Sequence, residues 1–134
     1  FDIILIDLPP TINILTLNAL ACADAYLIPT DISEYSKAGI NAIQKLANTV
    51  KSKGLNPNLE FCGVVITSFQ KGGAIAIRAL VDELIEQYTD KLLPMRINDS
   101  VKVTESQRQH VPVGAAFPDN PVAVAYKELS EVIL

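Results

Sequence analysis

Apolar residues recur along the chain in two arrangements, short continuous runs and stripes at helical spacing. The runs predict strands at residues 1–6, 25–29, 61–67 and 91–97. The stripes predict helices at residues 14–23, 36–53, 74–88, 101–109 and 121–134, with a short segment at 112–116. The strand at 91–97 is the weakest, because Pro94 cannot donate to a sheet ladder.

Two helices show clear inward faces. Between residues 36 and 53, the apolar positions on one face are Ile40, Ile43, Leu46, Ala47 and Val50. In the last helix they are Val122, Ala125, Tyr126, Leu129 and Ile133. Gly54 and Pro57 end the first of these helices, and Pro121 begins the last one.

Strands that alternate with helices predict an α/β fold, with a mostly parallel sheet flanked by helices and one domain over residues 1–134. The run Phe1–Ile6 is nearly continuous in apolar and β-branched residues, as in a strand covered on both faces. A central strand needs neighbours on both sides. We therefore expect part of the sheet to lie upstream and the sequence to be a fragment.

Composition narrows the class of protein. With 134 residues, 49% of them hydrophobic, the chain can form its own core. Its net charge of -4 argues against a surface that is basic all over. Cys22 and Cys62 lie in separate apolar runs without metal-ligand spacing, so we expect both to be buried and reduced. No apolar run approaches the about 20 residues of a membrane span, and we expect a soluble, cytoplasmic protein.

One motif carries chemistry. Four apolar residues precede Asp7, which matches the Walker B pattern of a strand that bears a carboxylate at its carboxyl end. Mg²⁺ is held by one or two carboxylates together with waters and substrate phosphates. Asp at this place also caps helices. The five residues alone leave both roles open.

A longer resemblance starts at the same point. Its parts are Phe1–Pro10, Thr16–Leu20, Ala23–Asp24, Leu27–Pro29, Gly63–Thr67, Val101–Ser106, Val111–Val113 and Ala125–Leu129. In order and spacing they resemble the ParA/Soj partition ATPases, which are deviant-Walker P-loop proteins. The resemblance covers essentially the whole chain. It implies a P-loop NTPase-like fold that lacks the N-terminal part with the phosphate loop.

The resemblance also implies site residues. Asp7 would be the catalytic and metal-binding carboxylate, which holds Mg²⁺ through a water or orients the attacking water. The nucleotide-binding positions would be Pro9, Thr67, Ser68, Asn98, Asp99 and Ser100. Asn98 departs from the family, which has proline there. Turn and cap chemistry is the alternative role for these polar residues.

The phosphate loop of the family lies upstream of Walker B. Gln70–Gly73 looks like it, but Ala-Ile-Ala-Ile-Arg follows, and not Gly-Lys-Thr. We therefore expect ATP and Mg²⁺ to be cofactors of the intact protein, and this chain alone to bind neither and to be inactive.

The resemblance further implies non-specific DNA binding through basic residues of this half of the protein, since such binding needs cations opposite phosphates. The candidates are Lys102 and Arg108, with Arg78, Arg96 and Lys127 as further ones. Solvated surface is their alternative role. His110 has no cysteine or histidine partner at ligand spacing. Glu34–Tyr35 lies where the family has dimer-contact and switch segments, although Tyr35 could equally pack in the core.

The resemblance implies an intact ATPase that dimerises with ATP, binds DNA and moves plasmids or chromosomes with a ParB-like partner. MinD-like ATPases and bacterial tyrosine kinases are the nearest alternatives. The last helix carries only Lys127 as a basic residue, unlike a membrane-binding helix, and a tyrosine-rich tail is absent. A non-catalytic interaction module is the alternative from another class.

Overall fold

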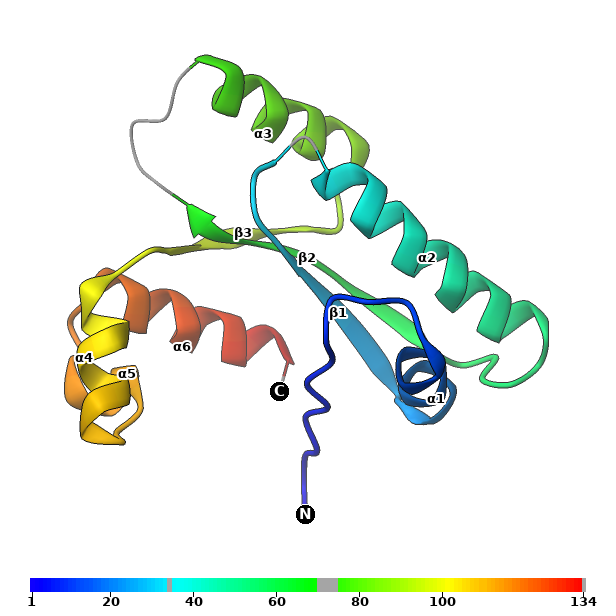
Figure 1. Ribbon diagram of the computed structural model, residues 1–134, viewed down its shortest axis with the longest axis horizontal. Coiled ribbons are helices and arrows are strands. Elements are labelled where there is room, and N and C mark those ends of the chain that lie inside the picture. Colours follow the sequence, from blue (N-terminus) through cyan, green and yellow to red (C-terminus); the bar gives the residue numbers. More distant parts are fainter. Residues whose placement is uncertain (34, 70–74, 134) are drawn as a thin grey trace. The chain divides into compact units, whose positions relative to one another are not determined.

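The computed structural model describes residues 1–33, 35–69 and 75–133, and Figure 1 shows the course of the chain. Its elements are α1 (Ile14–Cys22), β1 (Ala25–Thr30), α2 (Ser36–Ser52), β2 (Glu60–Phe69), α3 (Ile75–Gln87), β3 (Leu92–Asn98), α4 (Val101–Gln109), α5 (Val113–Ala116) and α6 (Pro121–Ile133). Each was predicted to within about two residues. Glu34 and the sequence Gln70–Gly73, which looks like a phosphate loop, lie outside the described residues.

The strands form one sheet in the order β1-β2-β3. β2 and β3 pair in parallel, with Thr67 opposite Ile97 and Phe69 opposite Asn98. The parallel pairing confirms the predicted α/β architecture. It also brings the carboxyl ends of β2 and β3 to the same edge of the sheet.

The predicted strand at residues 1–6 is wrong. Residues 1–9 form neither helix nor strand, and the apolar side chains of residues 1–6 are exposed, with Ile4 at 74% and Leu5 at 79%. A strand forms only when a neighbour supplies hydrogen-bond partners for its backbone. The described sheet contains β1, β2 and β3, and none of them pairs with this segment.

The chain folds as two compact units, one from residues 1–27 and 37–62 and the other from residues 28–36 and 63–134. In the first unit, Leu20, Ala47, Val50 and Leu59 form a buried cluster. The Asn56 side chain donates to the carbonyls of Leu20 and Ala23, at 3.0 and 2.7 Å. These bonds fix the end of α1 beside the loop that follows α2.

An aromatic pair adds to the first unit. The rings of Tyr26 and Phe61 stack with centroids 5.0 Å apart. Burial raises the pKa of the Tyr26 phenol above its ordinary value. The phenol therefore stays neutral in the folded chain well into the alkaline range.

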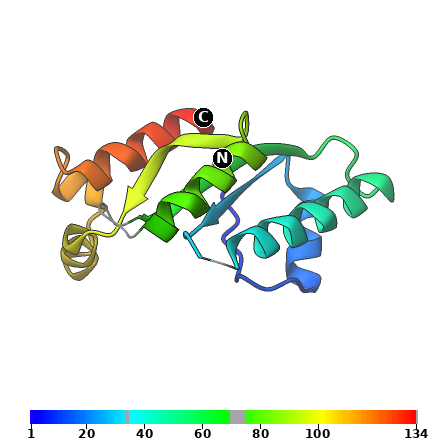
Figure 2. The same cartoon turned by 90° about the horizontal axis from the view of Figure 1, so that it is seen from above.

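In the second unit, α3 and α6 lie on opposite sides of β3 (Figure 1). Figure 2 shows α6 running alongside β3, and the two elements are in contact. The largest fully buried side chains of this unit are Ile66, Leu84, Val64, Val65 and Val122. α5 contacts both α4 and α6, so the three helices form one cluster beyond the end of β3.

Gly63 begins the part of β2 that belongs to the second unit. Its φ is +140°, and a Cβ at this position would lie 2.4 Å from the Lys91 carbonyl oxygen. That carbonyl accepts a 2.7 Å hydrogen bond from the Val64 amide. Only glycine allows the two backbones to approach so closely.

Several predicted burials are wrong. Cys22 is exposed, and so are Ile133 and Tyr126 of α6, while Val122 and Ala125 are buried as predicted. Tyr35 is 83% exposed, which excludes core packing for that ring. In the described part of the chain, no helix combines the length and the apolar character that a membrane crossing requires.

Candidate functional site

A cavity of about 520 Å³ opens in the second unit, at the carboxyl ends of β2 and β3. Its walls come from the end of β2, the turn between β3 and α4, the first turn of α4, and α6. The lining residues are Thr67, Ser68, Ile97, Asn98, Asp99, Ser100, Val101, Val103, Thr104 and Tyr126. We call this cavity the strand-end pocket.

Five of the six predicted nucleotide-binding positions line the strand-end pocket. Thr67 and Ser68 come from β2, and Asn98, Asp99 and Ser100 come from a segment about thirty residues later. The parallel pairing of β2 and β3 accounts for their meeting. The sixth position, Pro9, and the predicted carboxylate, Asp7, belong to the other unit.

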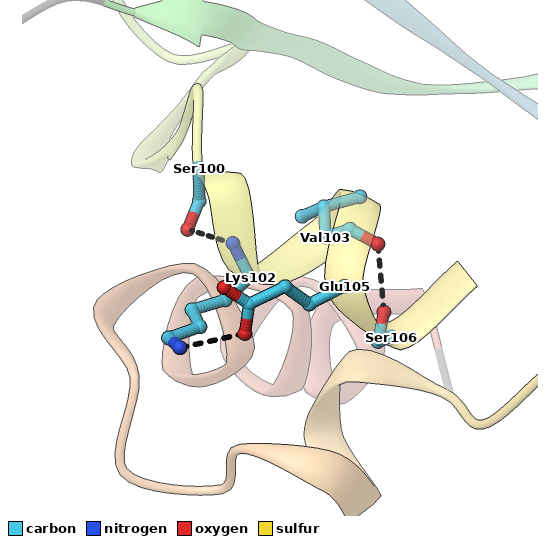
Figure 3. Close-up of polar contacts among 5 residues, drawn as sticks. All are labelled: Ser100, Lys102, Val103, Glu105 and Ser106. Atoms are coloured by element: carbon cyan, nitrogen blue, oxygen red, sulfur yellow. Dashed lines mark hydrogen bonds and ion pairs between the residues drawn. The ribbon is translucent and has the colours of Figure 1, made fainter. Parts of the chain in front are cut away.

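Ser100 serves as the N-cap of α4. Its side-chain oxygen accepts a 3.2 Å hydrogen bond from the Lys102 amide (Figure 3). The cap anchors the first turn of α4 at the pocket wall. The predicted alternative of cap chemistry therefore applies to Ser100, which lines the pocket as well.

Two residues on the β2 side are also constrained. The Thr67 hydroxyl donates to the Thr30 carbonyl at 3.2 Å, so the hydroxyl proton is used and its lone pairs remain as acceptors. Ser68 has a left-handed φ of 53°. Non-glycine residues seldom adopt this conformation, and strained backbone of this kind clusters at ligand-binding sites.

Asn98 ends β3, and its Oδ1 atom is buried without a hydrogen-bond partner. A buried acceptor without a donor costs about 1–3 kcal/mol, so native chains rarely contain one. Asn98 also lines a cavity large enough for a heteroaromatic ring.

The charge of the pocket limits the chemistry of its ligand. Among the described lining residues, Asp99 carries a charge, and lysine, arginine and histidine are absent. A polyphosphate needs cations or several free backbone amides. A neutral, planar group with hydrogen-bond donors therefore suits this pocket better than a phosphate.

Half of the pocket was missed from the sequence. Ile97 was assigned to a strand, and Tyr126 was assigned to the core. Val101, Val103 and Thr104 were assigned to a helix within the resembling segment Val101–Ser106, without a binding role. Tyr126 is 45% exposed and lines the pocket from α6. An apolar stripe at helical spacing identifies the inward face of a helix, but it does not show which residues of that face line a cavity.

The predicted DNA-binding residues both lie on α4. Lys102 Nζ is 2.6 Å from Glu105 and 4.7 Å from the centroid of the Phe117 ring (Figure 3 shows the ion pair). Arg108 is exposed in the last turn. His110 follows as the C-cap with a left-handed φ of 54°. Lys102 is thus already paired, whereas Arg108 extends from the end of the helix.

Asp7 is exposed in the segment that precedes α1. The N-cap of α1 is Asn13, whose side chain accepts from the amides of Leu15 and Thr16. Helix capping is therefore the wrong role for Asp7. Over residues 1–33, 35–69 and 75–133, no group of three or more His, Cys, Asp or Glu side chains could hold a metal ion.

Known proteins agree with this architecture. A family model described as an AAA domain matches residues 1–61. Over its whole length the chain is 28% identical to the chromosome-partitioning ATPase Soj of Thermus thermophilus, of which it covers 53%. It is 34% identical over 105 residues to the chromosome partitioning protein ParA of Myxococcus xanthus, a match that covers 78% of this chain and 36% of that protein.

A solved structure extends the comparison to the fold. Cyanthece apo McdA matches 86% of this chain and 46% of its own with a TM-score of 0.68 and 15% identity, which supports the P-loop NTPase-like architecture. The chain spans about half the length of the curated relatives that it matches. These matches confirm the predicted resemblance to the ParA/Soj-type partition ATPases.

Proposed function

We propose that this chain supplies the base-binding and DNA-contacting part of a ParA-like ATPase, which partitions plasmids or chromosomes. The intact protein would dimerise with ATP, bind DNA without sequence preference, and respond to a ParB-like partner. The relatives named for chromosome partition support the cellular role. The strand-end pocket is the observation that carries the molecular role.

The pocket suits a nucleobase for three reasons. Its volume of about 520 Å³ is in the range of small-molecule sites. Its lining combines apolar side chains, an aromatic ring at Tyr126 and polar atoms at the strand ends. It lies at the carboxyl edge of a parallel sheet, where α/β proteins bind their ligands.

The phosphates of the nucleotide would need other residues. No basic side chain occurs among the described residues that line the pocket, and Asp7 is a single exposed carboxylate. One carboxylate suffices for Mg²⁺ only when phosphate oxygens and waters complete the shell. We therefore expect metal binding only together with a nucleotide whose phosphates are held elsewhere in the intact protein.

Titration of the ¹⁵N-labelled chain with adenosine tests the base site. We expect shifts of the backbone amides of Thr67, Ser68 and Asn98–Ser100, whereas Gly54 and Leu55 in the other unit should not move. Ribose is the matched control and should leave the same amides in place. Shifts spread over both units, or absent from the strand ends, would refute base binding in this pocket.

The same titration with Mg-ATP separates the contribution of the base to binding from that of the phosphates. Because the described residues that line the pocket include no cation, Mg-ATP should bind no more than about twofold tighter than adenosine, and calorimetry should detect no high-affinity binding. A micromolar dissociation constant for Mg-ATP would contradict the proposal, since it would require a phosphate site within this chain.

A further inference from the structure

We propose that two copies of this chain associate through a basic surface at the end of α2 in one copy and an acidic surface at the end of α3 in the other. The basic surface consists of Lys45, Lys53 and Leu55. The acidic surface consists of Asp82, Ile85, Glu86 and Asp90. This contact goes beyond the proposed function, because it requires neither nucleotide nor DNA.

The charges of the chain are unevenly distributed. Residues 35–59 contain four lysines and no aspartate or glutamate, although the net charge of the whole chain is -4. This stretch includes α2 and the turn that follows it. Residues 79–90 contain four acidic residues and no lysine or arginine. The positive stretch of one copy therefore attracts the negative stretch of another.

Two of the four lysines are available to a partner. Lys51 Nζ donates to the Leu59 carbonyl at 2.8 Å, and Lys37 has an interaction within the chain. Lys45 and Lys53 are exposed and make no ion pair in the part of the chain that the structure describes. Their ammonium groups can therefore meet carboxylates of a second copy without breaking a contact.

The acidic surface is equally open. Asp82, Glu86 and Asp90 are exposed, and their carboxylates have no ion pair over residues 35–69 and 75–133. Ile85 is 42% exposed on the same part of α3, and Leu55 is 58% exposed in the turn after α2. Each charged surface thus contains one exposed apolar side chain, which association would remove from water.

The two surfaces also match in spacing. Lys45 and Lys53 are eight residues apart, and so are Asp82 and Asp90. Both stretches are helical over most of their length. Residues four and eight positions apart lie on one face of a helix, and eight residues span about 12 Å. Two ion pairs can therefore form together when α2 of one copy lies beside α3 of the other.

A nucleic acid fits the basic surface less well. Its two available lysines would neutralise about two phosphates, whereas a strong DNA-binding protein makes about 6–10 phosphate contacts. DNA would leave the exposed Leu55 without an apolar partner, and it would be repelled by the acidic surface. A second copy supplies a partner for both surfaces.

A dilution series of the ¹⁵N-labelled chain tests the contact. At low salt, and between about 20 μM and about 1 mM protein, the backbone amides of both surfaces should shift with concentration, because exposed ion pairs give weak association. At about 500 mM NaCl the shifts should disappear, since salt screens exposed charges. Association through the exposed apolar residues Phe1–Ile6 would instead persist in salt and shift amides near the N-terminus.

Charge reversal connects association to the named residues. Lys45→Glu with Lys53→Glu leaves the chain with two acidic surfaces, and Asp82→Lys with Glu86→Lys leaves it with two basic ones. Each double variant alone should associate at least about tenfold more weakly than the unaltered chain in sedimentation equilibrium. An equimolar mixture should restore association, because each reversed surface then meets its opposite. Lys127→Glu, at an exposed position of α6, is the control and should leave association unchanged.

Undiminished association of either double variant, or a mixture that fails to associate, would overturn the inference. It would also be overturned if Lys45→Glu with Lys53→Glu weakened DNA binding by the intact protein and left self-association unchanged. All four substituted positions are exposed, so circular dichroism should show nearly unchanged melting temperatures. If the lysine substitutions at Asp82 and Glu86 lower the melting temperature, Asp82→Asn with Glu86→Gln is the milder variant and should still weaken association.

Discussion

At the scale of single residues, the two polar side chains before and at the start of α1 have different roles. Asn13 accepts from two backbone amides at the helix start. Asp7 is exposed six residues earlier. The sequence left capping and metal chemistry both open for Asp7, because residue type does not reveal where the helix begins.

Asp7→Ala and Asn13→Ala should therefore separate stability from activity. Asn13→Ala should lower the free energy of unfolding by about 1 kcal/mol, the usual cost of a lost N-cap. Asp7→Ala should cost clearly less in urea denaturation. In the intact ATPase, Asp7→Ala should reduce ATP turnover while the melting temperature stays nearly the same, and undiminished turnover would remove Asp7 from the active site.

Two glycines form a second matched pair. Gly63→Ala should lower the free energy of unfolding by about 1–3 kcal/mol, because the new Cβ would meet the Lys91 carbonyl at a φ that alanine avoids. Gly39→Ala, in α2 with nothing within 4 Å, should instead raise it by up to about 1 kcal/mol. Chemical denaturation of both variants is the measurement. Equal changes in the free energy of unfolding would show that the backbone at Gly63 can move away from the Lys91 carbonyl at no cost.

At the scale of elements, local signals account for what could be predicted. Ser100 and the left-handed His110 delimit α4, and the predicted range of 101–109 is confirmed. The segment at residues 1–6 has an equally clear pattern and forms no strand. A helix satisfies its own backbone hydrogen bonds, whereas a strand depends on another element, and this dependence is not visible in the segment's own residues.

The two predicted DNA-binding residues, Lys102 and Arg108, both lie on α4. In the intact protein, Lys102→Glu with Arg108→Glu should weaken binding to all sequences alike and flatten the dependence of log affinity on log salt, by about 0.9 for each lost phosphate contact. Arg108→Glu alone should cause most of the loss in DNA affinity, because Lys102 is already paired with Glu105. Lys53→Glu, in the turn after α2 in the other unit, is the control. If the slope of log affinity against log salt concentration is unchanged in the double variant, neither residue contacts DNA phosphates.

At the scale of the whole molecule, the topology explains why most of the candidate site could be predicted. Thr67, Ser68 and Asn98–Ser100 meet because β2 and β3 run in parallel, and alternating strands and helices already indicate parallel pairing. The contribution of Tyr126 could not be predicted, since it depends on where α6 packs against β3. The missing donor at Asn98 likewise follows only from three-dimensional packing.

The exposed apolar segment Phe1–Ile6 has a consequence for how the isolated chain behaves at high concentration. Six residues with high β-propensity, one charge and no proline have the composition of a steric zipper, in which identical segments of many chains stack. We expect concentrated samples to form fibrils that bind thioflavin T. Ile4→Lys should suppress them, whereas Ile14→Lys, which alters another exposed apolar position, within α1, should not. Fibrils that persist in Ile4→Lys would have to begin from another segment; if they are suppressed, one lysine in this hexapeptide is enough to keep the isolated chain in solution.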